Sequence, residues 1–120
     1  MVAESQELIY KRCRPCEGMG QPLNAEQAQE YLKDLPQWKL NANSRTICRE
    51  YVMKNFMATI RLINSIAKIA EEENHHPDLH LTGYRRLKVE LSTHAIGGLS
   101  ENDFIEAAKI NLLPAETKES

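Results

Sequence analysis

The strongest constraint on this chain is a long helical pattern that lies between two segments of strand-like alternation. Residues 54–73 place apolar side chains at intervals of three and four, which is the spacing of an amphipathic helix. We expect the buried stripe of this helix to comprise Phe56, Ile60, Ile63, Ala67 and Ala70, widened by Met57, Ile66 and Ile69. The helix should end at Asn74, shortly before Pro77, because a proline disfavours helical backbone in the residue before it.

Short strands are predicted on both sides of this helix. Residues 38–40 form one strand, and residues 45–53 alternate after a turn, with apolar side chains on both faces, so that either face could point inward. After the helix, residues 79–82 alternate up to a turn at Gly83, and residues 87–91 alternate cleanly between apolar and polar side chains. The sequence therefore predicts one strand pair before the long helix and one after it.

Two further helices carry capping signals. Asn24, followed by Gln27, has the pattern of a capping box and begins a helix that ends at Pro36. Ser100, followed by Asp103, begins a last helix in the same way. The predicted order is helix, strand, strand, helix, strand, strand, helix. This order indicates an α+β fold, a four-stranded antiparallel sheet with helices packed on one face.

Composition and charge limit the function classes. With 42% hydrophobic and 27% charged residues, the 120-residue chain has the composition of one folded domain. We expect an irregular arm at residues 1–23, the domain at residues 24–113 and a frayed tail at residues 114–120. The formal charge of −2, from 15 basic and 17 acidic residues, disfavours direct binding to nucleic acid. The chain should act on a small molecule or on another protein.

The sequence also indicates a compartment. No apolar run approaches the roughly 18 residues needed to span a membrane, and residues 1–12 lack the apolar core of a secretory signal. Cys13, Cys16 and Cys48 are too few for a disulfide scaffold. The first two have the spacing of a zinc knuckle or a redox pair, but no second such pair completes four zinc ligands. We expect reduced thiols in a protein of the cytoplasm or an organellar matrix, not a secreted one.

All four histidines lie within a short part of the chain. An imidazole has an unperturbed pKa of about 6.5 and can therefore give or accept a proton near neutrality. His75 and His76 follow the long helix, and His94 follows the strand at residues 87–91. If the last two strands pair, these three side chains could face one cleft. His80 lies on a half-exposed strand and is expected to be a bystander.

Other interpretations of these side chains stay open. The pair His75 and His76 could simply be a polar helix exit. On a regular strand, His76, Asp78 and His80 would share one face and could bind Zn²⁺, with His94 opposite. Asp103 is expected first as the capping carboxylate of the last helix and second as a site residue.

Several of these residues stand in an order that resembles a known family. The order is Glu71-Glu-Glu-Asn-His75-His76-Pro77, an aromatic at Tyr84, Leu91-Ser-Thr-His94, and Gly98-Leu-Ser-Glu-Asn-Asp103. It closely resembles the pterin-4a-carbinolamine dehydratase family, and the resemblance covers roughly residues 23–111. The arm, with Cys13-x-x-Cys16, resembles a longer branch of that family found in plants, protists and some bacteria.

The resemblance implies the function and the site. It implies dehydration of a 4a-hydroxytetrahydropterin to a quinonoid dihydropterin, in the recycling of the reduced pterin used by aromatic amino-acid hydroxylases. The catalytic residues would be His75, His76 and His94, working by general acid–base chemistry without a metal or a cofactor. The pterin would be bound by Glu71, Asn74, His75, His76, Pro77, Ser92, Thr93, His94, Ala95, Ile96 and Asp103.

The resemblance also implies partners and leaves one alternative. A homodimer or homotetramer is expected, through the long helix or through an edge strand at residues 87–91. The alternative is a non-catalytic homologue that binds pterin or protein, such as a dimerisation cofactor of a transcription factor or a molybdenum-cofactor-related protein; the three retained histidines favour the enzyme. Asn74 is neutral where the family is often acidic, and should therefore raise the pKa of the neighbouring histidine less than a carboxylate would. Ile96 is apolar where animal members have cysteine.

Overall fold

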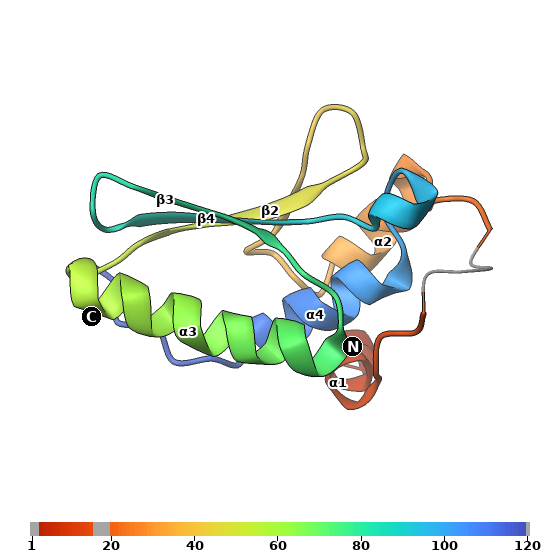
Figure 1. The fold of residues 1–120 in the computed structure, drawn as a ribbon. Coiled ribbons are helices and arrows are strands. Elements are labelled where there is room, and N and C mark those ends of the chain that lie inside the picture. The colour runs from red at the N-terminus through yellow and green to blue at the C-terminus, as the bar shows by residue number, and fades with distance from the viewer. Residues whose placement is uncertain (1–2, 16–19, 120) are drawn as a thin grey trace.

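A computed structural model describes residues 3–15 and 20–119 and confirms the α+β class (Figure 1). Its sheet has four antiparallel strands, and the predicted order is extended by one helix at the start. The elements, in chain order, are α1 (Ala3–Tyr10), α2 (Ala25–Leu32), β1 (Lys39–Leu40), β2 (Ile47–Val52), α3 (Phe56–Glu73), β3 (Asp78–Thr82), β4 (Arg86–Leu91), the short 3₁₀ helix η1 (His94–Ile96) and α4 (Glu101–Asn111).

The two strand pairs join through β2 and β4, which gives the sheet order β1-β2-β4-β3. In this register Ile47 lies opposite Leu91, and Leu79 lies opposite Val89. β4 is therefore an interior strand, and the expectation that residues 87–91 form an edge strand is wrong. Leu87, Val89 and Leu91 are fully buried, whereas the leucines of β3 are half-buried, so the more apolar strand occupies the centre.

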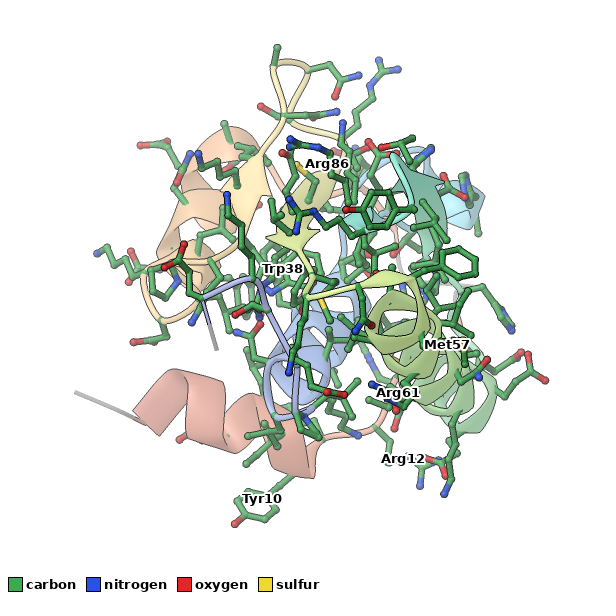
Figure 2. The ribbon with its side chains drawn as sticks, turned by 90° about the vertical axis from the view of Figure 1, so that its left-hand side faces the viewer. Tyr10, Arg12, Trp38, Met57, Arg61 and Arg86 are labelled. Carbon is green, nitrogen blue, oxygen red and sulfur yellow. The ribbon has the colours of Figure 1, made fainter. Side chains whose placement is uncertain are left out.

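One face of the sheet carries the core and the other faces solvent. Ile47 and Tyr51 of β2 point inward, which answers the question that the apolar residues on both faces left open. α3 and α4 lie along the same side of the sheet in Figure 1. Figure 2 shows Trp38 directed into the interior, where its ring N–H donates to Asn111 at 2.8 Å. Arg86 lies on the open face.

The predicted stripe of α3 is only partly correct. The buried residues of this helix are Ala58, Thr59, Leu62, Ile66, Ala70 and Glu73. Phe56 and Met57, which the stripe included, are 46% and 58% exposed, and Met57 lies on the outer side of the helix (Figure 2). Apolar residues occur on more than one face of α3, so periodicity alone could not identify the face that packs on the sheet and on α4.

Local capping signals proved reliable. In the first capping box, the Gln27 backbone N–H donates to the Asn24 side chain at 2.8 Å, and the Asn24 N–H donates to the Gln27 side chain at 2.9 Å. Ser100 and Asp103 form the second box at the start of α4. Both boxes were predicted, because each depends on residues only three positions apart.

The prediction of an irregular arm at residues 1–23 is wrong at its start, where α1 forms. Leu8 of α1 is buried in the main core, and α1 packs against α4. A helix of eight residues is too short to show a clear period, and isolated helices of this length are marginal, so its stability comes from tertiary packing. Cys16 lies outside the described residues.

The prediction of a frayed tail is also wrong over most of its length. The Lys54 N–H donates to the Glu116 carbonyl at 2.8 Å, and the Lys118 N–H donates to the Val52 carbonyl at 2.9 Å. Arg61 forms an ion pair with Glu116 at 2.7 Å. The tail thus pairs with the chain between β2 and α3, a contact between residues too distant in sequence to predict. None of the helices in the described part of the chain has the length and apolar character needed to cross a membrane.

Candidate active site

The end of α3 determines the different burial of the two adjacent histidines. Asn74 ends the helix in the left-handed conformation, with φ 53° and ψ 43°. Asparagine tolerates this conformation better than most residues, so the amide at this position has a conformational reason. The His75 N–H then donates to the Ala70 carbonyl at 3.1 Å. After this turn the His75 side chain is buried, at 5% exposure for the residue, and His76 is exposed.

The buried histidine bonds to a buried carboxylate. His75 Nε2 lies 2.7 Å from Asp103 Oδ1. The other carboxylate oxygen, Asp103 Oδ2, accepts from the Thr93 hydroxyl at 2.8 Å and from the Ser100 backbone N–H at 2.9 Å. Thr93 Oγ1 and Ser100 Oγ are themselves 2.7 Å apart. This network joins the end of α3, the segment after β4 and the start of α4.

Asp103 therefore has the capping role expected of it, and it also bonds to His75. It completes the capping box of α4 and holds His75 in place. A buried carboxylate needs hydrogen-bond donors to offset the loss of water, and the first turn of a helix also favours a negative charge. Both conditions are met at Asp103.

The second histidine has a similar partner in a different environment. His76 Nε2 lies 2.6 Å from Glu71 Oε2, and these side chains are 55% and 77% exposed. Glu71 lies in the last turn of α3, so the chain folds back on that turn to make the contact. The contact can orient the His76 ring, but exposed pairs of this kind contribute little to stability.

The third histidine begins η1. The chain turns back here because Thr93 and Gly98 pair, with the Thr93 N–H donating to the Gly98 carbonyl at 2.7 Å. Gly97 adopts a positive φ of 70°, which glycine allows without strain. His94 and Ala95 are exposed at this turn, and Ser92 and Ile96 are half-buried.

The structure brings two of the predicted segments to one carboxylate. His75 and Thr93 bind opposite oxygens of Asp103. The two segments that carry their neighbours His76 and His94 are therefore held together at this carboxylate. The predicted residues Asn74 and Pro77 belong to the first segment, and Ser92, Ala95 and Ile96 belong to the second. A hollow of about 230 Å³ includes Ile96 and Ser100 and reaches the arm at Arg14 and Gln21. Another hollow, of about 620 Å³ between α1 and α2, has none of the histidines in its lining.

His80 lies outside this arrangement. It projects from the open face of the sheet, and its Nε2 is 2.7 Å from Glu90 Oε1 on β4. His76 and His80 thus contact different carboxylates, those of Glu71 and Glu90. Within residues 3–15 and 20–119, no three His, Cys, Asp or Glu side chains are grouped to hold a metal ion, so the zinc alternative has no ligand set there.

The arm packs against the end of α3 and the start of α4, which the sequence did not predict. The Cys13 N–H donates to Glu73 Oε1 at 2.8 Å, and Lys109 Nζ donates to Glu73 Oε2 at 2.6 Å. Burial raises the pKa of Glu73, but these two hydrogen bonds outweigh it, together with the charges of Lys109 and Arg12, and leave the pKa below its ordinary value. Asn102 donates to the Arg14 carbonyl at 2.7 Å, which fixes the arm to α4.

The environment of Cys13 favours a structural thiol. Burial raises its pKa far above the ordinary value, and the negative charges of Glu106 and Glu73 raise it further. Its Sγ lies 3.5 Å from the Asn102 carbonyl oxygen. Because the thiolate is the form that binds metals and attacks disulfides, a thiol with this pKa is poorly suited to either.

Glu106 is a second residue that the sequence analysis missed. It is fully buried on α4, and neither carboxyl oxygen has a hydrogen-bond partner among the described residues. Burial raises its pKa to about 8, with added repulsion from Asp103 and Glu73 and an opposing effect of Lys109. Its position three residues after Asp103 was the available signal, since that spacing places both side chains on one side of a helix.

Comparison with known proteins identifies the family of this chain. The sequence pattern of the family described as "Pterin 4 alpha carbinolamine dehydratase" matches residues 21–113. A Nitrosomonas eutropha protein named "Putative pterin-4-alpha-carbinolamine dehydratase" is 46% identical over 108 residues, which cover 89% of this chain and 93% of that protein. A Legionella pneumophila protein of the same name is 46% identical over 110 residues, which cover 91% and 96%.

A solved structure gives the same fold. It is described as "transcriptional coactivator/pterin dehydratase from Brucella Melitensis", with a TM-score of 0.70 and 30% identity, and the match covers 75% of this chain and 95% of that one. The fold and the comparisons define a small α+β dehydratase. The chain belongs to the pterin-4a-carbinolamine dehydratase family and, by homology, has that hydro-lyase activity.

Proposed function

We propose that His75, His76 and His94 catalyse this dehydration by general acid–base chemistry on a 4a-hydroxytetrahydropterin left by an aromatic amino-acid hydroxylase. The 4a-hydroxyl leaves as water once it is protonated, and N5 loses its proton as the C=N bond forms. One proton is taken up and one is released, so the reaction needs proton-handling groups and no net oxidation. The observation that carries the proposal is the 2.7 Å contact between buried His75 and buried Asp103.

The contact gives the two ring nitrogens of His75 different roles. Asp103 accepts the Nε2 proton, which leaves Nδ1 to exchange a proton with the substrate. The carboxylate also stabilises the imidazolium that forms when His75 takes a proton. Asp103 is thus a positioning residue, held by Thr93 and Ser100 through its other oxygen.

His94 supplies the second proton transfer, and His76 contacts the pterin, where it can serve as the base. Glu71 holds His76 at 2.6 Å, and the η1 turn presents His94 to solvent one residue after Thr93. The pterin then lies along the two segments anchored at Asp103. Its proposed border consists of Glu71, Asn74, Pro77, Ser92, Thr93, Ala95 and Ile96.

The test is a coupled assay in which a hydroxylase generates the 4a-carbinolamine and its dehydration is followed optically. His75→Ala and His94→Ala should each lower turnover by about 10²–10⁴-fold, the usual contribution of a general acid or base. His80→Ala is the matched control, since His80 has a carboxylate partner but lies on the open sheet face. Circular dichroism confirms that each variant is folded. Wild-type rates in both folded variants would overturn the assignment.

The same assay separates the enzyme from a non-catalytic homologue. No acceleration by the folded wild-type chain, together with measurable pterin affinity by calorimetry, would indicate a pterin-binding descendant. Neither acceleration nor affinity would indicate a protein-binding role.

We also propose that the chain forms a homodimer or homotetramer through α3 or the free edge of β3. Phe56 and Met57 are exposed on α3, and β3 is paired on one side only. Light scattering after size exclusion tests the state, and Met57→Glu should shift a helix-mediated oligomer towards a smaller species. A cytoplasmic or organellar-matrix location fits the free Cys13 thiol, because thiols stay reduced in such compartments. Residues 24–113 form the proposed dehydratase domain.

A further inference from the structure

Glu106 is a buried carboxyl group one helical turn beyond Asp103. It is fully buried, and its two oxygens lack hydrogen-bond partners within the part of the chain that the structure describes. A residue three positions away on a helix lies on the same side, so Glu106 and Asp103 are neighbours on α4. A buried carboxylate without a donor is strongly disfavoured, whereas the uncharged acid is tolerated.

The charged groups around Glu106 come from three elements. Asp103 and Lys109 share its helix, Glu73 lies at the end of α3, and Cys13 lies on the arm. Lys109 is 2.6 Å from Glu73, and Arg12 is 3.2 Å from the same carboxylate. Asp103 is bonded to His75. These cations and donors are thus committed to Glu73 and Asp103, and no described residue bonds to the Glu106 carboxyl group.

We propose that Glu106 is a positioning residue that acts on His75 through Asp103, as an uncharged acid that leaves Asp103 the single negative charge facing the imidazole. When Glu106 loses its proton, a second negative charge lies one turn from Asp103. His75 then holds its proton more tightly and exchanges it less readily with the substrate. This inference rests on the proposed role of His75.

The direction of the pH effect follows from burial. Burial first, and then the charges of Asp103 and Glu73, raise the pKa of Glu106 from an ordinary 4.5 to about 8. The uncharged form therefore predominates at neutral pH and is lost as the pH rises through about 8. Turnover should fall over the same range.

The test measures kcat from pH 6 to pH 10 for the full-length wild type and for Glu106→Gln, which keeps the shape of the side chain and cannot ionise. Wild-type kcat should fall about tenfold from pH 7 to pH 9, as expected for one essential protonated group. In Glu106→Gln the fall over the same range should be less than twofold. An unchanged alkaline fall would overturn the proposal. Glu106→Leu serves the same purpose if the amide variant does not fold.

A second readout separates this inference from the proposed function. Imidazole nitrogen chemical shifts of His75, measured by NMR on the full chain, should show an upper inflection near pH 8 that Glu106→Gln removes. An upper inflection that persists in Glu106→Gln would overturn the coupling. A purely packing role would lower the melting temperature of Glu106→Gln and leave this inflection in place. If the wild type does not dehydrate the carbinolamine, the proposed function fails, and the His75 titration still decides whether Glu106 acts on His75.

Discussion

Two adjacent histidines make the same type of contact in opposite environments. His75 lies 2.7 Å from Asp103 in the interior, and His76 lies 2.6 Å from Glu71 at the surface. The distances are nearly equal, but only the inner carboxylate has two further donors and no contact with water. The difference teaches that the environment of a pair, and not the distance between its atoms, decides what the pair contributes to stability.

The largest expected effect comes from breaking the inner pair. Asp103→Ala should lower the free energy of unfolding by about 3–5 kcal/mol, because it leaves His75, Thr93 and the Ser100 N–H without their shared acceptor. Urea unfolding measures the loss, and the carbinolamine assay should show reduced turnover. Asp103→Asn is the companion variant, since it retains an oxygen acceptor. A loss below 1 kcal/mol for both variants would contradict the role assigned to the buried network.

The next largest effect is expected from Glu106→Gln, which replaces an ionisable group near the inner pair with an amide of the same shape. Because the pKa of Glu106 is about 8 in the folded chain and near 4.5 when unfolded, the folded state keeps a proton that the unfolded state releases. Its contribution to stability is complete below about pH 4.5 and is lost as the pH rises through 8. Glu106→Gln should therefore gain stability over wild type between pH 5 and pH 8 by about 3 kcal/mol. Parallel stability curves for the two proteins would contradict a raised pKa.

The features of the fold that were predicted are those encoded by near neighbours. The capping boxes at Asn24 and Ser100, the alternation of β4 and the end of α3 at Asn74 each depend on a few consecutive residues. The buried face of α3, the helix α1 and the pairing of the tail with Val52 depend on packing between distant segments. No local pattern could supply them.

The residues of the candidate site also divide into those predicted from the sequence and those that only the tertiary structure reveals. The motif residues His75, His94 and Asp103 were predicted from their order in the sequence, and in the structure His75 bonds directly to Asp103. Glu106 was not identified, because its spacing from Asp103 was a weak signal and it resembles an ordinary surface glutamate on a helix until the arm and the end of α3 are known to pack near it. Their placement requires the tertiary structure.

A smaller effect is expected at Asn74, the residue directly before the two histidines. Asn74 has a positive φ of 53°, and its turn directs His75 inward and His76 outward. Asn74→Ala should cost about 1 kcal/mol, the lower end of the penalty for a side chain in the left-handed region, whereas Asn74→Gly should be close to neutral. Thermal unfolding compares the two variants. Equal losses in both would mean that the amide contributes through its own contacts and not through its backbone conformation.

The smallest effect on stability is expected from breaking the outer pair. Glu71→Gln removes a charge from a contact whose side chains are more than half exposed, so it should change the free energy of unfolding by less than about 0.5 kcal/mol. If Glu71 orients His76 for the reaction, turnover of the variant should still fall by a few-fold. Added salt should lower the turnover of wild type towards that of the variant, because exposed charges are screened. Urea unfolding and the carbinolamine assay at two ionic strengths measure both quantities. A loss of stability as large as that of Asp103→Ala would mean that burial does not separate the two pairs, and the comparison between them would fail.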